Sequence, residues 1–422
     1  MIQEFRVKNF MSFKDEQVLS FEATADTTSL EYLTYEVKPN LRLLKMAIIY
    51  GANASGKTNL LFAIETLLRL LRIPRSRKSE NIYFEPFAFT ENEPTEFKIT
   101  FYIEKVKYQY NLLYNKNGIL YEKMEYAPNG IISLFYEREL LESENESKIK
   151  FGNLLNLSYK AKRTIEDNTF NNHTLLSTFE KITVDAKPFE LIHDWLDDNI
   201  HNSATEDSTL DIIKKISTDE NRSKFIFDSL FLADFNISKI EVLEVKSEIP
   251  NEIREQIQND PELPISIKEQ LLQDVKEDTF FTHHCVNGDF VLRKRMESTG
   301  TLSYLKLLDR LYDIIKEDHI SFYDEVEESV HYDLLIHYLS LFMMNSKASQ
   351  LIFTTHDQLL LDEDFIRRDM VWFTDKSKDT GGSELYSAAE FGLHKNISLY
   401  KAYKVGKLGA KPELGSIFLE NR

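Results

Sequence analysis

This sequence has only one cysteine, and it lacks both long apolar runs and a basic leader. Its single cysteine, Cys285, permits no internal disulfide within the 422 residues. No run of about 18 apolar residues occurs that could span a bilayer. The opening residues, Met1 to Arg6, do not show the basic and then apolar pattern of a secretory signal. These absences predict a soluble, cytoplasmic protein without a membrane partner.

Positive charge is also scarce, because 51 Lys and Arg stand against 69 Asp and Glu, a formal net charge of −18. A protein that coats nucleic acid non-specifically neutralises phosphates with clustered Lys and Arg, so this balance argues against that class. Nucleic acid remains a partner only through a local basic groove. Two segments could line such a groove, although charge runs more often form solvated faces; they contain Arg69, Arg72, Arg75, Arg77 and Lys78, and Lys395, Lys401, Lys404, Lys407 and Lys411.

Apolar residues are plentiful, at 42% of the chain with 29 Phe and 20 Tyr, which excludes a disordered protein. Alternating or continuous apolar runs predict strands at 5–10, 18–21 and 45–50. An apolar stripe predicts a helix over 58–71, which Pro74 ends.

Changes of pattern along the chain predict three parts. Strand patterns between about 84 and 126 indicate an antiparallel lobe, which completes an N-terminal part over 1–136. Helical periodicities predict a mainly helical insertion over 137–230. The rest, 231–422, returns to the core and carries a polar excursion at about 247–278.

The run from Phe280 to Leu292 contains Asn287-Gly288 between two apolar segments, which is a strong hairpin signal. His283, His284 and Cys285 lie together in its first strand. Adjacent strand residues point to opposite faces, so these three cannot converge on one metal ion without ligands from elsewhere.

A phosphate-binding loop follows the apolar strand 45–50. Glycines let backbone N–H groups curl around phosphates at a helix N-terminus, while a lysine adds a point charge and a hydroxyl binds Mg²⁺. The strand before the loop and the striped helix after it are the context that this motif requires. The candidate nucleotide-binding residues are Gly51, Asn53, Ala54, Ser55, Gly56, Lys57, Thr58 and Asn59.

Two further strands end in polar residues. Asp324 and Glu325 follow the segment 319–323, and His356 follows the apolar strand 350–355, only 31 residues after Glu325. An isolated Asp-Glu pair is more often surface charge. One helix at 332–344 fits between the two strands, however, so a βαβ crossover would bring both strand ends to the same edge of a sheet. Asp324 would then support Mg²⁺, and Glu325 would act as general base.

Small residues open the helix predicted at 302–315. Ser298 and Gly300 lie in the segment Glu297-Ser298-Thr299-Gly300-Thr301, and Ser and Gly at a helix N-terminus form an anion cradle. Alone, this is an ordinary helix cap. Its place before the Asp324 strand is that of an ABC signature loop.

In this order, the motifs GANASGKT, ESTGT, FYDE and TTHD resemble those of ABC ATPases of the SMC/RecF branch. The opening FRVKNFMSFKD resembles the first strand and loop of that branch. More narrowly, the chain looks like the AbiL/RloA-like bacterial phage-defence ATPases, which include the ATPase component of the PARIS system. The segments that carry this resemblance are NNHTLLS, LFLADFNISKIEV, ESTGT, TTHDQLLLD, RRDMVWFTDK and KAYKVGKLGAKPELG. The resemblance implies an α/β, ABC-type P-loop head with an antiparallel β lobe and a mainly helical insertion.

The resemblance also implies roles for single residues. Lys57 and Thr58 would bind ATP and Mg²⁺, Asp324 would support the metal, Glu325 and His356 would be catalytic, and Ser298 with Gly300 would act on ATP held by a second subunit. Two features depart from the general pattern: the signature is ESTGT rather than LSGGQ, and no Q-loop glutamine is evident, since Gln109 lies within a predicted strand.

The function implied is a slow, dimer-dependent ATPase that senses or regulates in anti-phage defence. A homodimer or higher homo-oligomer would share the ATP sites, and a separate nuclease or toxin would be the effector. The chief alternative is a RecF/SMC-like DNA-repair or DNA-clamp ATPase. A role as a transporter subunit agrees poorly with the long soluble insertion. A different class is a binding module in which ATP is only a structural clamp, and such a module would not require Glu325.

Overall fold

The computed structural model describes residues 1–141, 146–201, 208–246, 250–272, 275–394 and 397–412. The chain forms two compact units. Unit 1 comprises Met1–Ala204, Ile314–Glu327 and Ser340–Arg422, and unit 2 comprises Thr205–Asp313 and Glu328–Leu339. Lys395 and parts of the polar excursion, 247–249 and 273–274, lie outside the described residues.

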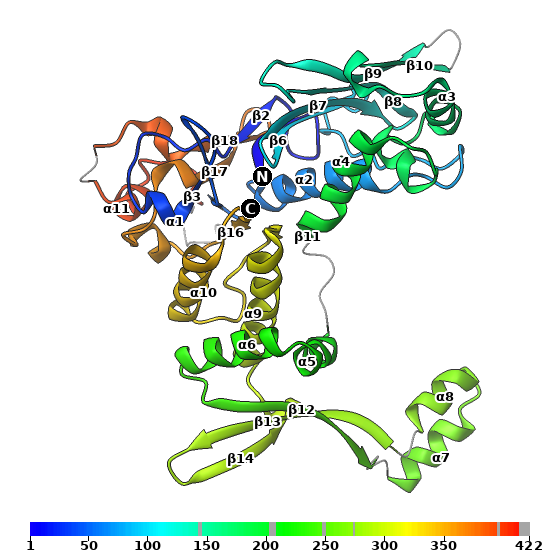
Figure 1. The fold of residues 1–422 in the computed structure, drawn as a ribbon. Coiled ribbons are helices and arrows are strands. Elements are labelled where there is room, and N and C mark those ends of the chain that lie inside the picture. The colour runs from blue at the N-terminus through cyan, green and yellow to red at the C-terminus, as the bar shows by residue number, and fades with distance from the viewer. Residues whose placement is uncertain (142–145, 202–207, 247–249, 273–274, 395–396, 413–422) are drawn as a thin grey trace, which may run out of the picture. The chain divides into compact units, whose positions relative to one another are not determined.

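A six-stranded, mainly parallel sheet is the centre of unit 1 (Figure 1). Its order is β11 (Ile200–His201), β15 (Ile320–Tyr323), β16 (Gln350–Thr354), β5 (Met46–Gly51), β17 (Val371–Lys376) and β18 (Ser383–Ser387). All residues of β5, β15 and β16 are buried, as continuous apolar strands in a parallel sheet should be. β15 and β16 are parallel neighbours joined through α10 (Tyr332–Asn345), so the predicted crossover is confirmed.

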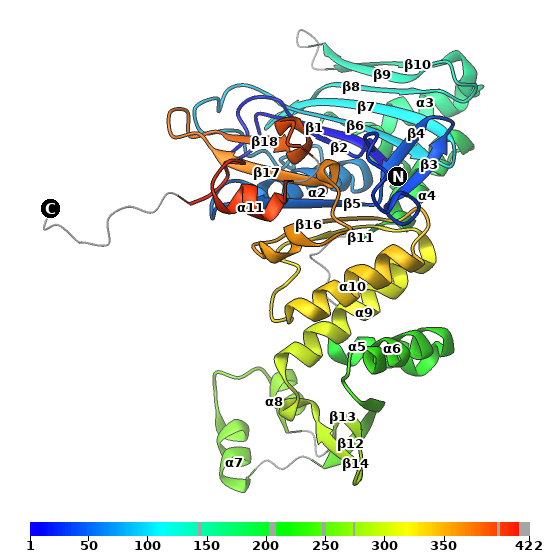
Figure 2. The same cartoon turned by 90° about the vertical axis from the view of Figure 1, so that its left-hand side faces the viewer.

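A seven-stranded antiparallel sheet forms the lobe of unit 1. Its order is β10 (Glu146–Phe151), β9 (Ser133–Leu141), β8 (Gly118–Tyr126), β7 (Val106–Asn115), β6 (Thr95–Ile103), β1 (Ile2–Lys8) and β2 (Gln17–Ser20). Helix α2 (Lys57–Arg72) lies between the two sheets, as Figure 2 shows. The predicted α/β class and antiparallel lobe are confirmed.

Residues 137–141 and 146–151, at the start of the predicted helical insertion, are strand instead of helix. β9 and β10 extend the lobe because Tyr136 and Phe135 point into its aromatic core, where both rings contact Phe189. Helices begin only afterwards, with α3 (Tyr159–Asn168) and α4 (Lys187–Asn199). Trp195 of α4 stacks on Phe101 at 4.8 Å, which fastens this helix to the sheet. The three-part division of the chain stays a prediction.

The NNHTLLS segment joins the lobe to helix α2. Thr174 donates its hydroxyl hydrogen bond to the Leu70 carbonyl in the last turn of α2, at 2.8 Å. Asn172 donates to the carbonyls of Arg77 and Glu80, both at 2.8 Å, in the loop after that helix. The lobe and the helix that begins at the phosphate-binding loop are therefore connected by one buried and two partly buried hydrogen bonds.

Smaller elements complete unit 1. They are α1 (Leu30–Leu33), β3 (Thr34–Lys38), β4 (Leu41–Leu44), α11 (Leu399–Lys404) and the short 3-10 turns η1 (Asn153–Leu155), η2 (Leu176–Glu180), η4 (Leu359–Asp362), η5 (Arg368–Met370) and η6 (Ala388–Phe391). No helix among the described residues is long and apolar enough to cross a membrane.

Unit 2 combines helices with a three-stranded antiparallel sheet, ordered β12 (Ile237–Lys246), β13 (Val275–Cys285) and β14 (Gly288–Arg293). The predicted Asn-Gly hairpin is confirmed: Cys285 pairs with Gly288, whose φ of 117° is available to glycine at low cost. The other elements are α5 (Thr209–Thr218), α6 (Glu220–Leu232), α7 (Asn251–Asn259), α8 (Ile265–Leu271) and η3 (Lys294–Met296). Helix α9 (Thr299–Glu317) begins in unit 2 and ends in unit 1.

Candidate functional site

The phosphate-binding loop turns sharply between β5 and α2. Its backbone requires small residues: a Cβ on Gly51 would lie 2.4 Å from the Ser55 hydroxyl oxygen, and one on Gly56 would lie 2.6 Å from that of Ser383. Gly56 also has a φ of 115°, and Ala54 one of 62°. Asn53 and Ala54 lie exposed at the turn. The backbone of the loop thus packs closely against neighbouring side chains at Gly51 and Gly56, while the exposed turn leaves the start of α2 accessible.

Lys57 is the first residue of α2 and is only 6% exposed. Its ammonium group donates hydrogen bonds to the carbonyls of Gly51, at 3.1 Å, and Ala52, at 3.3 Å. Burial lowers the pKa of Lys57, and the carboxylates of Glu325, Asp324 and Glu327 oppose that shift. A lysine that faces this group of carboxylates is suited to an anionic ligand that carries its own metal ion.

Thr58 and Asp324 lie in direct contact. The Thr58 hydroxyl donates to Oδ2 of Asp324 at 2.8 Å, and the Thr354 hydroxyl donates to Oδ1 of the same carboxylate at 2.6 Å. Hydroxyl and carboxylate oxygens are the protein ligands that Mg²⁺ prefers. The residues present therefore fit a magnesium ion bound with phosphates beside the loop.

Glu325 and His356 lie side by side after neighbouring strands β15 and β16. Glu325 Oε1 is 3.5 Å from Nε2 of His356, and both side chains are exposed. The φ of Glu325 is 50°, and its backbone N–H donates to the Thr354 hydroxyl at 2.8 Å. The His356 backbone N–H donates to Oε1 of Glu327 at 2.6 Å. Because parallel strands end at one edge, both residues reach the edge that carries the phosphate-binding loop.

Ser298 and Gly300 belong to unit 2, where they open α9. The Ser298 hydroxyl accepts from the Thr301 backbone N–H at 3.0 Å and shares a 2.8 Å hydrogen bond with the Thr301 hydroxyl. A Cβ on Gly300 would lie 3.1 Å from the Ser329 carbonyl oxygen, so this position favours a residue without a side chain. Ser298 itself is exposed. The turn is a capped helix start with an accessible hydroxyl.

Three residues that support the site were not assigned from the sequence. Thr354 contacts both Asp324 and Glu325, as described above. Ser12 accepts a 2.8 Å hydrogen bond from the side chain of Asn59, and Thr374 shares one of 2.6 Å with Ser55. A hydroxyl two residues before His356 at the end of a strand was a usable signal for Thr354. Ser12 and Thr374 are too far from the loop in sequence to be found by spacing.

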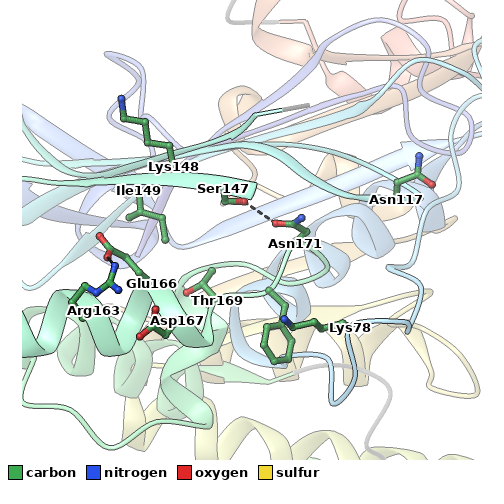
Figure 3. A pocket seen from close by; sticks show the side chains of 11 residues that line it. Lys78, Asn117, Ser147, Lys148, Ile149, Arg163, Glu166, Asp167, Thr169 and Asn171 are labelled. Carbon is green, nitrogen blue, oxygen red and sulfur yellow. Dashed lines mark hydrogen bonds and ion pairs between the residues drawn. The ribbon is translucent and has the colours of Figure 1, made fainter. Parts of the chain in front are cut away.

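A cavity of about 670 Å³ in unit 1 lies between β10 and α3 and contains none of the predicted site residues (Figure 3). Four of its lining residues pair with one another: Ser147 donates to Asn171 at 2.9 Å, and Arg163 lies 3.7 Å from Glu166. Glu180, His193 and Asp197 form the one group of potential metal ligands found among the described residues. Asp197 accepts from Arg72 at 2.6 Å, and neither acid is buried. We assign neither feature a role.

Comparison with known proteins identifies a family for this chain. A family model described as "AAA domain, putative AbiEii toxin, Type IV TA system" matches residues 46–362. The comparison with curated proteins gave no match. Similar solved structures include the SMC head domain from Thermotoga maritima, with a TM-score of 0.40 and 10% identity over 92% of this chain and 98% of that chain. An Smc head with an extended coiled coil bound to the C-terminal domain of ScpA, derived from Pyrococcus furiosus, has a TM-score of 0.37 and 14% identity over 97% and 99%. Since the family model spans well over half of the sequence and includes the whole loop, this chain belongs to that family of AAA domains and is a P-loop ATPase.

Proposed function

We propose that this chain hydrolyses ATP slowly, in a dimer that shares its ATP sites, and that this cycle controls an effector in bacterial anti-phage defence. The observation that carries the proposal is the convergence, at one edge of the parallel sheet, of Lys57 with Thr58, Asp324, Glu325 and His356. These side chains come from three segments distant in sequence, and solvent reaches four of the five. Neither packing nor folding requires such a group of charges.

Each residue has a role that its position supports. Lys57 contributes positive charge to the β- and γ-phosphates, and the backbone N–H groups of the loop orient them. Thr58 and Asp324 would hold Mg²⁺, which would supply positive charge to offset the charge that develops on the transferred phosphoryl group. Glu325 orients and deprotonates the attacking water, and His356, next to it, hydrogen-bonds at the γ-phosphate. Thr354 keeps the Asp324 carboxylate and the backbone of Glu325 in place.

The shared-site part of the proposal rests on Ser298 and Gly300. Their turn offers an exposed hydroxyl and a helix N-terminus, both of which suit a phosphate. In the proposed dimer this turn closes the ATP site of the other subunit. Glu325→Gln should bind ATP and accumulate the associated form, because hydrolysis no longer resets it. Ser298→Arg should prevent association while it leaves ATP bound to each monomer. Sizing chromatography with ATP and Mg²⁺ tests this, and identical assembly of wild type and both variants would refute shared sites.

The defence role follows from the resemblance of the sequence to phage-defence ATPases and from the family description, which names a putative toxin of a toxin–antitoxin system. A nuclease or toxin encoded beside this gene is the expected effector. The test is co-expression of that neighbour with wild type and with Lys57→Ala, followed by phage challenge and co-purification. Protection that requires Lys57 and the neighbour together supports the proposal. Equal protection by Lys57→Ala contradicts it.

A DNA-clamp function receives less support from the basic segment after α2. Arg72 donates to Asp197 at 2.6 Å, Arg69 lies over the ring of Tyr83 at 5.5 Å, and Lys78 lies over that of Phe170 at 5.0 Å. Three of these five cations thus make contacts within the chain. Binding of duplex DNA that weakens steeply with rising salt concentration would nevertheless favour the DNA-clamp function over the defence role.

A further inference from the structure

We propose that the hairpin β13–β14 sets the position of the Ser298 turn, with His283 and Glu297 as the positioning residues. The inference rests on the proposed shared ATP site and names what controls it. A change in the conformation of the hairpin, for instance when another molecule binds it, would thereby displace Ser298. The displaced turn would then close the ATP site of the partner subunit less well or better.

The link is a short, partly buried hydrogen bond between the hairpin and the residue that precedes Ser298. Nε2 of His283, in β13, lies 2.6 Å from Oε1 of Glu297. The Glu297 side chain is 4% exposed and that of His283 is 15% exposed. A carboxylate with so little access to water depends on its partner, because an unpaired buried charge is costly. Glu297 therefore follows His283 if the strand moves.

The hairpin holds His283 from a second side. His283 pairs across the strands with Phe290 of β14, and the two rings stack at 5.1 Å with an interplanar angle of 11°. β13 is also the central strand of its sheet, paired with β12 on its other edge. The position of the imidazole is thus fixed relative to the sheet. We therefore expect Glu297 to move together with the sheet.

The turn beyond Glu297 has little freedom to absorb a displacement. Glu297 donates its backbone N–H to the Lys294 carbonyl at 3.1 Å, which closes the 3-10 turn η3 between β14 and the signature segment. The Ser298 hydroxyl caps α9 by accepting a hydrogen bond from the Thr301 backbone N–H. The Ser329 carbonyl oxygen lies so close to Gly300 that a Cβ there would be 3.1 Å from it. A displacement of Glu297 consequently also displaces Ser298, because the segment between them cannot change its conformation to compensate.

His284 provides a matched control on the same strand. It points to the opposite face, is 71% exposed, and pairs with Asp289 at 2.6 Å, the same type of bond at the same distance. Asp289 lies in the hairpin itself rather than next to Ser298. Replacement of His284 therefore removes a histidine–carboxylate hydrogen bond from the hairpin and leaves the contacts of the Ser298 turn intact.

The experiment introduces His283→Ala, His283→Gln and His284→Ala, each in the Glu325→Gln background. Association is followed by sizing and light scattering over a range of ATP concentrations, and ATP binding by a fluorescent analogue under conditions that keep the protein monomeric. His283→Ala should raise the ATP concentration for half-maximal association about tenfold or more, with ATP affinity of the monomer changed less than twofold. His283→Gln, which retains a donor, should recover part of the loss, and His284→Ala should match the parent.

A second measurement does not depend on association. Hydrogen exchange of the nucleotide-free monomer should show faster exchange at the Thr301 and Leu302 amides in His283→Ala than in His284→Ala, since these N–H groups bond to Ser298. Equal exchange in the two variants overturns the inference, as does equal association. If Glu325→Gln fails to associate with ATP at all while exchange still responds to His283, the shared-site function fails and the mechanical link stands.

Discussion

The Thr354 hydroxyl donates a 2.6 Å hydrogen bond to Asp324 and accepts one of 2.8 Å from the backbone N–H of Glu325. Thr354 ends β16, whereas both acidic residues follow β15, so a single hydroxyl on one strand orients two candidate functional residues on its neighbour. Glu325 adopts a φ of 50°, a region that costs free energy for a residue with a side chain. The hydrogen bond from its N–H helps to hold that conformation.

Thr354→Val should therefore lower ATP turnover about tenfold or more, while ATP binding through Lys57 persists. The reason is that Val keeps the volume but removes the donor to Asp324 and the acceptor for Glu325, each hydrogen bond contributing about 1 kcal/mol. Steady-state phosphate release measures the effect. Thr355→Val is the control on the next residue, because that hydroxyl accepts from Asp357 instead. A Thr354 variant no slower than the Thr355 variant would argue against this role.

Lys57→Met should abolish ATP turnover and yet stabilise the protein without nucleotide. Burial lowers the pKa of Lys57 below 10.5, so the folded state disfavours the charged amine. That cost is present in full at pH values below the lowered pKa and disappears as the pH rises past 10.5. At pH 7 Met avoids it and packs a similar length of chain. Thermal unfolding at pH 7 without nucleotide provides the test; a variant less stable than wild type would contradict the explanation.

The stability of unit 1 should decrease as the pH falls below about 6.5 because of His173. Burial lowers the pKa of His173 from 6.5 to about 3, with Lys181 and Arg138 acting in the same direction. Between pH 6.5 and about pH 3, His173 is protonated in the unfolded chain but stays neutral in the folded chain. The slope from this group approaches about 1.4 kcal/mol per pH unit. Urea unfolding at pH 7.5, 6.5 and 5.5 should show a steeper loss for wild type than for His173→Gln. His331→Gln, which alters an exposed histidine, should keep the wild-type slope.

Arg138→Met should cost about 3–5 kcal/mol of folding free energy, because it leaves Glu122 buried without its cationic partner. The two side chains are 1% and 0% exposed, and Nη1 of Arg138 lies 3.3 Å from Oε2 of Glu122. Arg138 also donates to the carbonyls of His173 and Phe170, both at 2.8 Å. In urea unfolding, the double variant Glu122→Gln with Arg138→Met should lose less than the sum of the single losses.

The control for that cycle is Arg163→Met, since Arg163 makes only an exposed contact with Glu166 at 3.7 Å. It should change stability by less than about 1 kcal/mol. Similar losses for Arg138→Met and Arg163→Met would mean that the buried pair contributes nothing beyond ordinary packing.

Local patterns in the sequence predicted the features that depend on neighbouring residues. The loop from Gly51 to Thr58, the helix after it, the strands of the lobe and the hairpin at Gly288 were all found in this way, because glycines, turn dipeptides and apolar periodicity act over a few residues. Local patterns did not predict the strands β9 and β10 in the segment 137–151, which was placed in a mainly helical insertion. Its polar run breaks the strand alternation, and the pairing of β9 with β8 that decides the outcome comes from residues near 121–126.

By itself, the sequence determined that this chain carries a P-loop, two acidic residues and a histidine after strands, and a small-residue turn before a helix. Only the tertiary structure decided that Thr354 orients Asp324 and Glu325, that Asn59 bonds Ser12, and that His283 is bound to the residue before Ser298. The physical reason is distance along the chain: these partners are separated by 14 to 47 residues in sequence. Strand register and helix packing bring them within hydrogen-bonding distance, and no local propensity encodes such register.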